Sequence, residues 1–305
     1  MAKEAPLLRA EPAFRGTRPG SGGFSLAFAR WELPEGQAPK GRVLLSHGYG
    51  EHGERYAHTA AWLLGLGWAV SSQDHRGFGR SEGPRGDADG GIAPFVADWR
   101  AFLAQERALA PSLPLVALGH SFGGLVVLLA ALEEAPAQDG LILSSPAVVL
   151  KSRGWAMNLL QATVGRLAPH LPVDMAGNKS LVCSDPELVN RYWADPLCHR
   201  TATPAFGRAL DEGTDRILAS GAGLAVPTLL LQAGQDTLVD LPRALAFWDS
   251  VNPAILERHL LEGFLHEVFH DRRRLEAQDL AADWLVRRLS PAAPGTPGRP
   301  EAMNA

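Results

Sequence analysis

Short apolar runs alternate regularly with longer segments of helical spacing along this chain, and this alternation most constrains the fold. A half-buried strand is expected at 24–33, buried strands at 42–46 and 68–72, and further strands at 114–118, 140–144, 227–232 and 256–261. Helices are expected at 56–66, 92–109, 124–132, 241–250 and 267–289. Apolar runs that are not interrupted by polar residues are typical of parallel strands buried on both faces. The pattern therefore predicts an α/β fold, with a mainly parallel sheet and helices on both faces.

The alternation stops between residues 147 and 222. Helices are expected there at 155–167, 186–194 and 204–218, with no strand candidate. Such a block is best explained as a helical cap inserted above the carboxyl ends of the strands, where open α/β sheets bind ligands. The predicted divisions are an irregular N-terminus (1–20), a core in two pieces (21–146 and 223–290), the cap (147–222) and a disordered tail (291–305).

Composition excludes several classes of protein. The 305 residues carry a net charge of −4 and no basic stripe, which argues against a nucleic-acid partner. The two cysteines, Cys183 and Cys198, imply neither a disulfide framework nor a metal site, and their pairing is left open. Neither a secretory signal nor a membrane-spanning run is evident, so we expect a cytoplasmic protein.

Residues 119–123 read Gly-His-Ser-Phe-Gly, between an expected strand and an expected helix. Small residues around a serine at such a junction are typical of the nucleophile elbow, a strained turn that exposes the hydroxyl. Gly-x-Ser-x-Gly also occurs by chance, so the motif alone leaves an ordinary turn open. In its context, the pattern predicts Ser121 as a catalytic nucleophile.

A serine nucleophile needs a base, oriented in turn by a carboxylate. Asp236 and His266 each follow an expected strand and lie at the same sheet edge as Ser121, in the order Ser, Asp, His. They are preferred over three competitors, which are expected at a helix cap, inside a strand and inside a helix: Asp240, His259 and His270. For the oxyanion, the backbone amides of Tyr49 and Phe122 are the expected donors.

The combined motifs resemble the monoacylglycerol lipase and lysophospholipase group of the α/β-hydrolases, which neighbours the S33 serine aminopeptidases. The similar segments are residues 47–52 with Arg55 and Tyr56, 74–83, 119–123, 184–186, Tyr192 with 195–197, 234–236 and 266–267. The resemblance implies a helical cap with an apolar tunnel, and hydrolysis of monoacylglycerol or related single-chain lipid esters without cofactor or metal. It also implies a polar pocket for the glycerol head formed by Arg55, His120 and Tyr192. Tyr49 departs from the group, since a smaller residue is common there.

The predicted cap helix around residues 154–173 is apolar around most of its circumference. Either it packs on the core, or one face lines an acyl tunnel while the other contacts a membrane or micelle surface. Other functions also stay open: a small-ester carboxylesterase, a lysophospholipase, a serine aminopeptidase using Glu51 or Asp185 to hold an α-amine, or an inactive scaffold. A serine at the elbow disfavours epoxide hydrolysis, which uses aspartate. The oligomeric state is not predicted.

Overall fold

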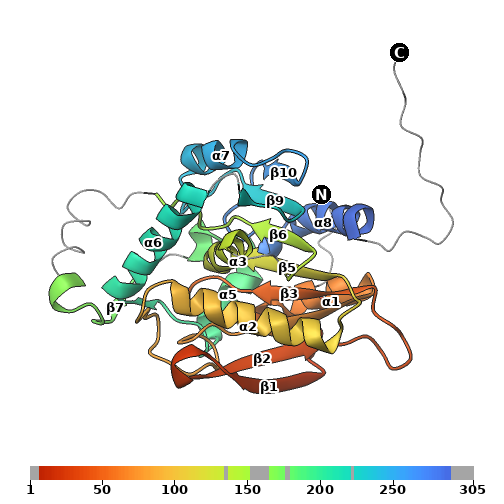
Figure 1. The fold of residues 1–305 in the computed structure, drawn as a ribbon, viewed down its shortest axis with the longest axis horizontal. Coiled ribbons are helices and arrows are strands. Elements are labelled where there is room, and N and C mark those ends of the chain that lie inside the picture. Colours follow the sequence, from red (N-terminus) through yellow and green to blue (C-terminus); the bar gives the residue numbers. More distant parts are fainter. Residues whose placement is uncertain (1–6, 134–136, 152–164, 176–178, 221–222, 290–305) are drawn as a thin grey trace, which may run out of the picture.

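Eight strands form one twisted sheet in the order β1-β2-β4-β3-β5-β6-β9-β10 (Figure 1). The computed structural model describes residues 7–133, 137–151, 165–175, 179–220 and 223–289. The strands are β1 (Phe14–Pro19), β2 (Ser25–Trp31), β3 (Gly41–Ser46), β4 (Trp68–Gln73), β5 (Leu115–His120), β6 (Gly140–Ser144), β9 (Thr228–Ala233) and β10 (Leu256–Leu261). The pairs β1–β2 and β2–β4 are antiparallel and all other pairs are parallel, which confirms the predicted fold class.

Helices cover both faces of the sheet, and the side chains of each strand divide between the two faces. On one face pack α2 (Ala93–Leu109), α3 (Phe122–Glu133) and α7 (Leu241–Asp249), and on the other α1 (Ala57–Gly65) and α8 (Arg274–Leu289). In β5, Ala117 contributes to the first core while Val116 and Leu118 contribute to the second. This period-2 division explains why consecutive residues of β5 are apolar, since both of its faces are buried.

Between β6 and β9 the chain forms the segment predicted as a cap. Its described elements are β7 (Val173–Asp174), the 3-10 turn η3 (Lys179–Leu181), α5 (Pro186–Ala194), β8 (Thr201–Ala202) and α6 (Pro204–Ser220). The expectation that this block contains no strand is wrong, because β7 and β8 pair as a short antiparallel ribbon. The expected helix at 155–167 lies mostly outside the described residues, and the predicted tail at 291–305 lies wholly outside them.

Two further corrections concern the ends of the chain. The expectation that residues 1–20 are irregular is wrong, because β1 adds an antiparallel edge strand to β2. The expected helix 267–289 is divided: residues Val268–His270 form the 3-10 turn η5, and α8 begins only at Arg274. No helix in the described part of the chain is long and apolar enough to cross a membrane.

Candidate active site

Ser121 lies between the end of β5 and the start of α3, in a left-handed backbone conformation with φ of 51°. The glycines around it are required by close packing. A Cβ on Gly119 would lie 2.7 Å from the Cα of Gly124, and a Cβ on Gly123 would lie 2.1 Å from the carbonyl oxygen of Ser46. Both separations are far below van der Waals contact, so only glycine allows this turn. The geometry is that of a nucleophile elbow.

His266 connects Ser121 to Asp236. Its Nε2 lies 2.8 Å from the Oγ of Ser121, and its Nδ1 lies 2.7 Å from the Oδ2 of Asp236. Asp236 follows β9 and His266 follows β10, so adjacent parallel strands deliver both side chains to the same edge of the sheet. The structure therefore brings together the three side chains that the sequence predicts as catalytic.

The carboxylate of Asp236 is held ionised beneath His266. Its Oδ1 accepts the amides of Leu238 at 2.8 Å and Val239 at 3.0 Å. Burial opposes ionisation, but the neighbouring His266 and these amides together hold the pKa of Asp236 below its usual value. Because Nδ1 of His266 then donates to the carboxylate, Nε2 is available to accept the proton of Ser121.

The competing candidates lie in structural roles. Asp240 accepts the amide of Arg243 with its side chain and caps α7, as expected. His259 is on β10, where its ring bonds to Glu257. His270 is buried in the 3-10 turn η5 rather than in the terminal α-helix, and burial holds its pKa well below the usual histidine value.

The loop after β3 borders the serine on the other side. A Cβ on Gly48 would lie 3.4 Å from the Cβ of Ser121, so the loop backbone passes directly beside the nucleophile. Glu51 fixes this loop, because its Oε1 accepts the amide of Gly48 at 2.6 Å and the hydroxyl of Tyr56 at 2.8 Å. Phe122 is the first residue of α3, and first-turn amides have no acceptor within their own helix.

A buried ionic network surrounds the residue after His266. The carboxylate of Glu267 bonds to Arg55 Nη2 at 3.2 Å and also pairs with Lys179 of η3. On its other side, the Arg55 guanidinium pairs with Glu51. Burial disfavours a charged Glu267, but Arg55 and Lys179 nevertheless hold its pKa well below the usual value. The network thus joins the loop after β3, the segment between β6 and β9, and the loop that carries His266.

The three residues expected to bind the glycerol head fall in different surroundings. His120 and Tyr192 line the cavity above Ser121. His120 Nδ1 donates to the carbonyl oxygen of Ser144 at 3.0 Å and lies 3.1 Å from the Oγ of the same residue. Burial lowers the pKa of His120 to about 3, so its ring is neutral at physiological pH. Arg55 is not among the lining residues; its guanidinium lies 5.1 Å from the centre of the Tyr192 ring. Lys179, which lines the cavity, was not predicted, because no local pattern marks it.

The cavity that contains Ser121 and His266 has a volume of about 490 Å³ and a largely apolar lining. The apolar lining residues from the segment between β6 and β9 include Leu150, Met175, Leu181, Trp193, Phe206 and Leu210. Tyr49 also lines it, with its ring 5.3 Å from that of Phe206. A cavity of this size, with a few polar groups at one end, suits a small ligand with an apolar chain.

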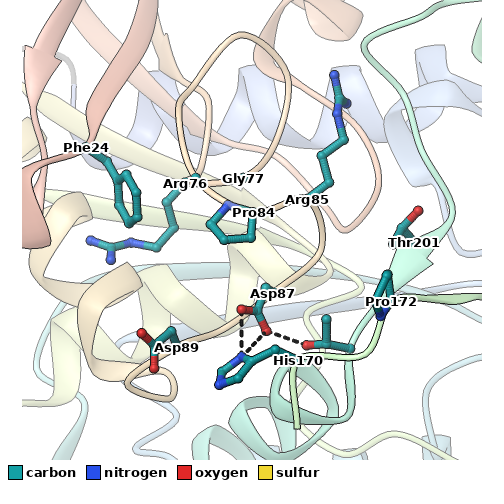
Figure 2. Close-up of a pocket in the computed structure, with 12 residues that line it drawn as sticks. Phe24, Arg76, Gly77, Pro84, Arg85, Asp87, Asp89, His170, Pro172 and Thr201 are labelled. Atoms are coloured by element: carbon teal, nitrogen blue, oxygen red, sulfur yellow. Dashed lines mark hydrogen bonds and ion pairs between the residues drawn. The ribbon is translucent and has the colours of Figure 1, made fainter. Parts of the chain in front are cut away.

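A second cavity, of about 520 Å³, lies between the loop at residues 83–89 and the segment at 170–203 (Figure 2). There Asp87 accepts from His170 and from the hydroxyl of Thr203, which ties the two segments together. Neither Ser121, Asp236 nor His266 lines this cavity. We therefore place the candidate chemistry in the cavity above Ser121.

Both cysteines are thiols, which answers the question of their pairing. Cys183 is buried and donates to the carbonyl of His270 at 3.3 Å. Cys198 lies in a different place, close to His52 and Asp195.

Comparison with known proteins agrees with this geometry. The "Serine aminopeptidase, S33" family matches residues 37–273. The chain is 32% identical to a monoacylglycerol lipase of Mycolicibacterium smegmatis, over 92% of this chain and 98% of that protein. It is 33% identical to the human monoglyceride lipase, over 78% of this chain and 79% of that protein.

Solved structures give the same result. The monoacylglycerol lipase of Paleococcus ferrophilus superposes with a TM-score of 0.75 at 26% identity, covering 86% of this chain and 99% of that one. A soluble variant of the Saccharomyces cerevisiae monoglyceride lipase superposes with a TM-score of 0.83 at 19% identity, covering 94% of this chain and 99% of that one. At this level of identity the match supports the fold alone. The predicted resemblance is confirmed: this chain belongs to the S33 serine aminopeptidase family of α/β-hydrolases.

Proposed function

We propose that this protein is a serine carboxylester hydrolase that cleaves monoacylglycerols or related single-chain lipid esters into a fatty acid and glycerol. The observation that carries the proposal is the pair of hydrogen bonds that links Ser121, His266 and Asp236, next to a largely apolar cavity. Relatives named monoacylglycerol lipase, of which one matches nearly the whole chain, support the substrate class.

In the proposed reaction, Nε2 of His266 takes the proton of Ser121 as the serine oxygen attacks the ester carbonyl. The amides of Tyr49 and Phe122 bind the resulting oxyanion; in comparable enzymes each such donor is worth about 3–4 kcal/mol. His266 then protonates the departing glycerol. A water molecule, deprotonated by His266, then attacks the acyl-enzyme; the second oxyanion collapses, the bond to Ser121 Oγ breaks, and His266 returns the proton to Ser121 as the fatty acid leaves. No step requires a cofactor.

We also propose that residues 147–222 act as a cap whose apolar side chains hold the acyl chain. Burial of each methylene contributes about 0.8 kcal/mol, so such a cavity favours longer chains over acetate. His120 and Tyr192 provide polar groups near Ser121 for the glycerol hydroxyls. Arg55 has an indirect role, because it pairs with Glu51 and Glu267 and holds both carboxylates in place.

Exposed apolar side chains at the rim support transient contact with a lipid surface. Met175, Leu181, Trp193 and Leu238 line the cavity and are also 41–55% exposed. We propose that this rim touches a membrane or micelle while a substrate enters. Co-sedimentation with phosphatidylcholine vesicles tests this: Trp193→Ser should reduce the bound fraction, and an unchanged fraction would exclude the rim. The cytoplasmic location stays a prediction.

The aminopeptidase alternative is less favoured, because both candidate carboxylates have other partners. Glu51 accepts from Gly48 and Tyr56 and pairs with Arg55. Asp185 caps α5 and pairs with Arg274. A comparison of kcat/KM for a monoacylglycerol chain-length series, lysophosphatidylcholine, short p-nitrophenyl esters and an aminoacyl anilide tests the proposal. We expect monoacylglycerols to be hydrolysed best, and preference for the anilide would overturn the assignment.

A further inference from the structure

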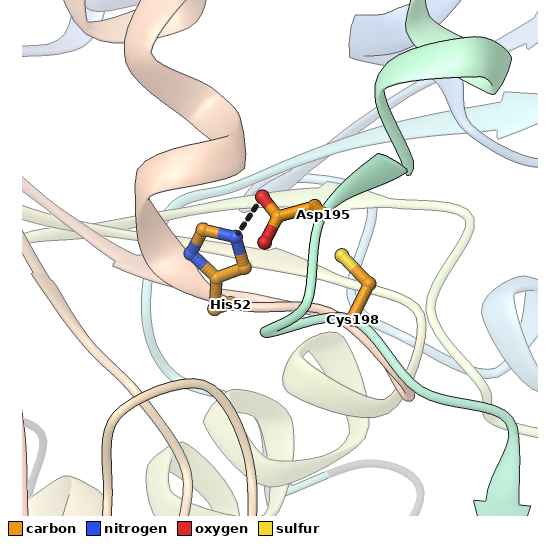
Figure 3. Close-up of side chains that lie close together, drawn as sticks. All are labelled: His52, Asp195 and Cys198. Carbon is orange, nitrogen blue, oxygen red and sulfur yellow. Dashed lines mark hydrogen bonds and ion pairs between the residues drawn. The ribbon is translucent and has the colours of Figure 1, made fainter. Parts of the chain in front are cut away.

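Three side chains able to bind a metal converge outside the proposed catalytic site (Figure 3). They are His52, from the loop after β3, and Asp195 and Cys198, from the segment that follows α5. One potential ligand atom of each residue lies within 4.8 Å of the other two. The Nε2 of His52 is 3.0 Å from the Oδ2 of Asp195, and the His52 side chain is only 5% exposed.

The backbone fixes these donors in place. The Oδ1 of Asp195 accepts the amide of Leu197 at 2.9 Å, so its Oδ2 is the oxygen that faces His52. The amide of Cys198 donates to the carbonyl of Asp195 at 3.1 Å, and this turn brings the thiol to the same side as the carboxylate. The next amide, that of His199, donates to the carbonyl of Gly50 at 3.0 Å.

One imidazole, one carboxylate and one thiol form a donor set that suits Zn²⁺, which binds nitrogen, oxygen and sulfur in tetrahedral geometry. With bonds of about 2.0–2.3 Å, ligand atoms of such a site are separated by roughly 3.3–3.8 Å. The donor atoms here lie within 4.8 Å of one another, with Nε2 of His52 and Oδ2 of Asp195 3.0 Å apart, so binding requires their side chains to shift to that spacing. We propose that His52, Asp195 and Cys198 bind one Zn²⁺ ion, with water as the fourth ligand.

Binding requires that the thiol of Cys198 and the Nε2 of His52 release any protons they carry to solvent, since both must offer a lone pair to the ion. The sequence predicts no metal site because His52 and Asp195 are 143 residues apart. Two lone cysteines without a recognisable spacing give no local signal of a site whose other ligands come from a distant loop.

A bound ion would join the loop that carries Tyr49 to the segment between α5 and β8. These two are already in contact, since His199 binds Gly50 and the hydroxyl of Tyr192 donates to the carbonyl of His199 at 3.0 Å. A ligand that binds only the folded protein stabilises it by mass action. Zn²⁺ should therefore raise the unfolding temperature.

Cobalt provides a direct test, because a Co²⁺–thiolate bond gives a charge-transfer absorption in the near ultraviolet that histidine and carboxylate ligands do not. The full-length protein without an affinity tag is treated with chelator, desalted and titrated with CoCl2. We expect a thiolate band that saturates at one equivalent and disappears when ZnCl2 is added. The Cys198→Ser variant should lose the band, while Cys183→Ser, which removes the other cysteine, should keep it.

Thermal unfolding with and without ZnCl2 gives an independent readout. The midpoint should rise for the unmodified protein and for Cys183→Ser, and should not move for Cys198→Ser or His52→Gln. Circular dichroism before heating establishes that each variant is folded. The proposal is overturned if no saturable thiolate band forms, if the band survives Cys198→Ser, or if Zn²⁺ shifts all variants equally. In that case His52 and Asp195 form only an ion pair between the two segments.

Discussion

Glu267, which follows His266 directly, bonds to Arg55 across 212 residues of sequence, and both side chains are buried. The catalytic histidine candidate is thus adjacent to a charge that is compensated entirely inside the protein. Lys179 supplies a second cation to the same carboxylate from the segment between β6 and β9. The position of His266 therefore depends on an ionic network that spans three parts of the chain.

Replacement of Glu267 by glutamine should destabilise the protein strongly. The amide keeps the shape of the side chain but leaves Arg55 and Lys179 with less compensating charge, and breaking a buried pair costs about 3–5 kcal/mol. Urea unfolding followed by circular dichroism measures the effect. Glu276→Gln is the matched control: it breaks an exposed pair with Arg273 and should cost less than about 1 kcal/mol. Equal losses for the two variants would contradict a structural role for the network.

The loss of stability caused by Glu267→Gln should depend on pH. Burial opposes the charge on Glu267, but Arg55 and Lys179 hold its pKa well below its usual value. The rings of His270 and His120 also interact with this carboxylate, and Glu51 pairs with Arg55. A depressed pKa stabilises the folded state fully above the unfolded value of about 4.3. The stability difference between the unmodified protein and Glu267→Gln should be largest near neutral pH and should shrink as the pH falls below about 4.3. A difference that stays constant down to pH 3 would contradict this assignment.

The parts of the site that sequence patterns identify are those at the ends of regular strands. Ser121, Asp236 and His266 each follow a strand that the sequence predicts, and parallel strands bring their carboxyl ends to one edge. Lys179 and the His52–Asp195–Cys198 cluster depend on how the segment between β6 and β9 folds over that edge. No periodicity records such a contact, so neither could be predicted.

The errors in the predicted fold have similar causes. β1 reads Phe-Arg-Gly-Thr-Arg-Pro and lies at the edge of the sheet, where most of its residues are exposed. Exposed positions need not be apolar, so the segment lacks the alternating pattern of a strand. β7 and β8 are two residues long, too short for an alternating pattern. In contrast, β6 is buried at every residue and agrees with its predicted bounds, because burial on both faces of a sheet favours a largely apolar run. β10 also agrees with its predicted bounds, although it lies at the other edge of the sheet and only Leu261 is buried.

Removal of the proposed nucleophile or its supporting acid should abolish hydrolysis without unfolding the protein. Ser121→Ala removes the attacking oxygen, and Asp236→Asn disturbs the tautomer of His266; each should lower kcat on a p-nitrophenyl ester by about 10⁴-fold or more. Asp240→Asn is the control, since asparagine also caps a helix and Asp240 lies outside the chain of contacts to Ser121. If Asp240→Asn lowers kcat as much as Asp236→Asn, the acid has been assigned to the wrong residue.

A bulky residue in the cavity should change the preference for chain length. Leu210 on α6 lines the cavity, and Leu210→Trp should fill the space of about two methylenes. At about 0.8 kcal/mol each, the ratio of kcat/KM for long over short acyl esters should fall roughly 15-fold. Leu218→Trp lies on the same helix but at an exposed position outside the cavity, so its ratio should not change. Unchanged preference in both variants would place the acyl chain elsewhere.

Replacement by alanine should have opposite effects on stability at two glycines, Gly123 in the nucleophile elbow and Gly65 at the end of α1. A Cβ on Gly123 would lie 2.1 Å from the carbonyl oxygen of Ser46 and 2.5 Å from that of His47, both backbone atoms that cannot rotate away. Gly123→Ala must therefore push α3 from β3, at a cost of about 3 kcal/mol, and should displace Ser121 from His266.

Gly65, at the end of α1, has no atom within 4 Å of an added Cβ, so Gly65→Ala should stabilise the helix by about 0.5–1 kcal/mol. Urea unfolding and ester hydrolysis separate the two cases: Gly65→Ala should keep full activity, while Gly123→Ala should lose both stability and rate. Full activity in Gly123→Ala would contradict this argument, because it would mean that the position of Ser121 does not depend on the close approach of α3 to β3.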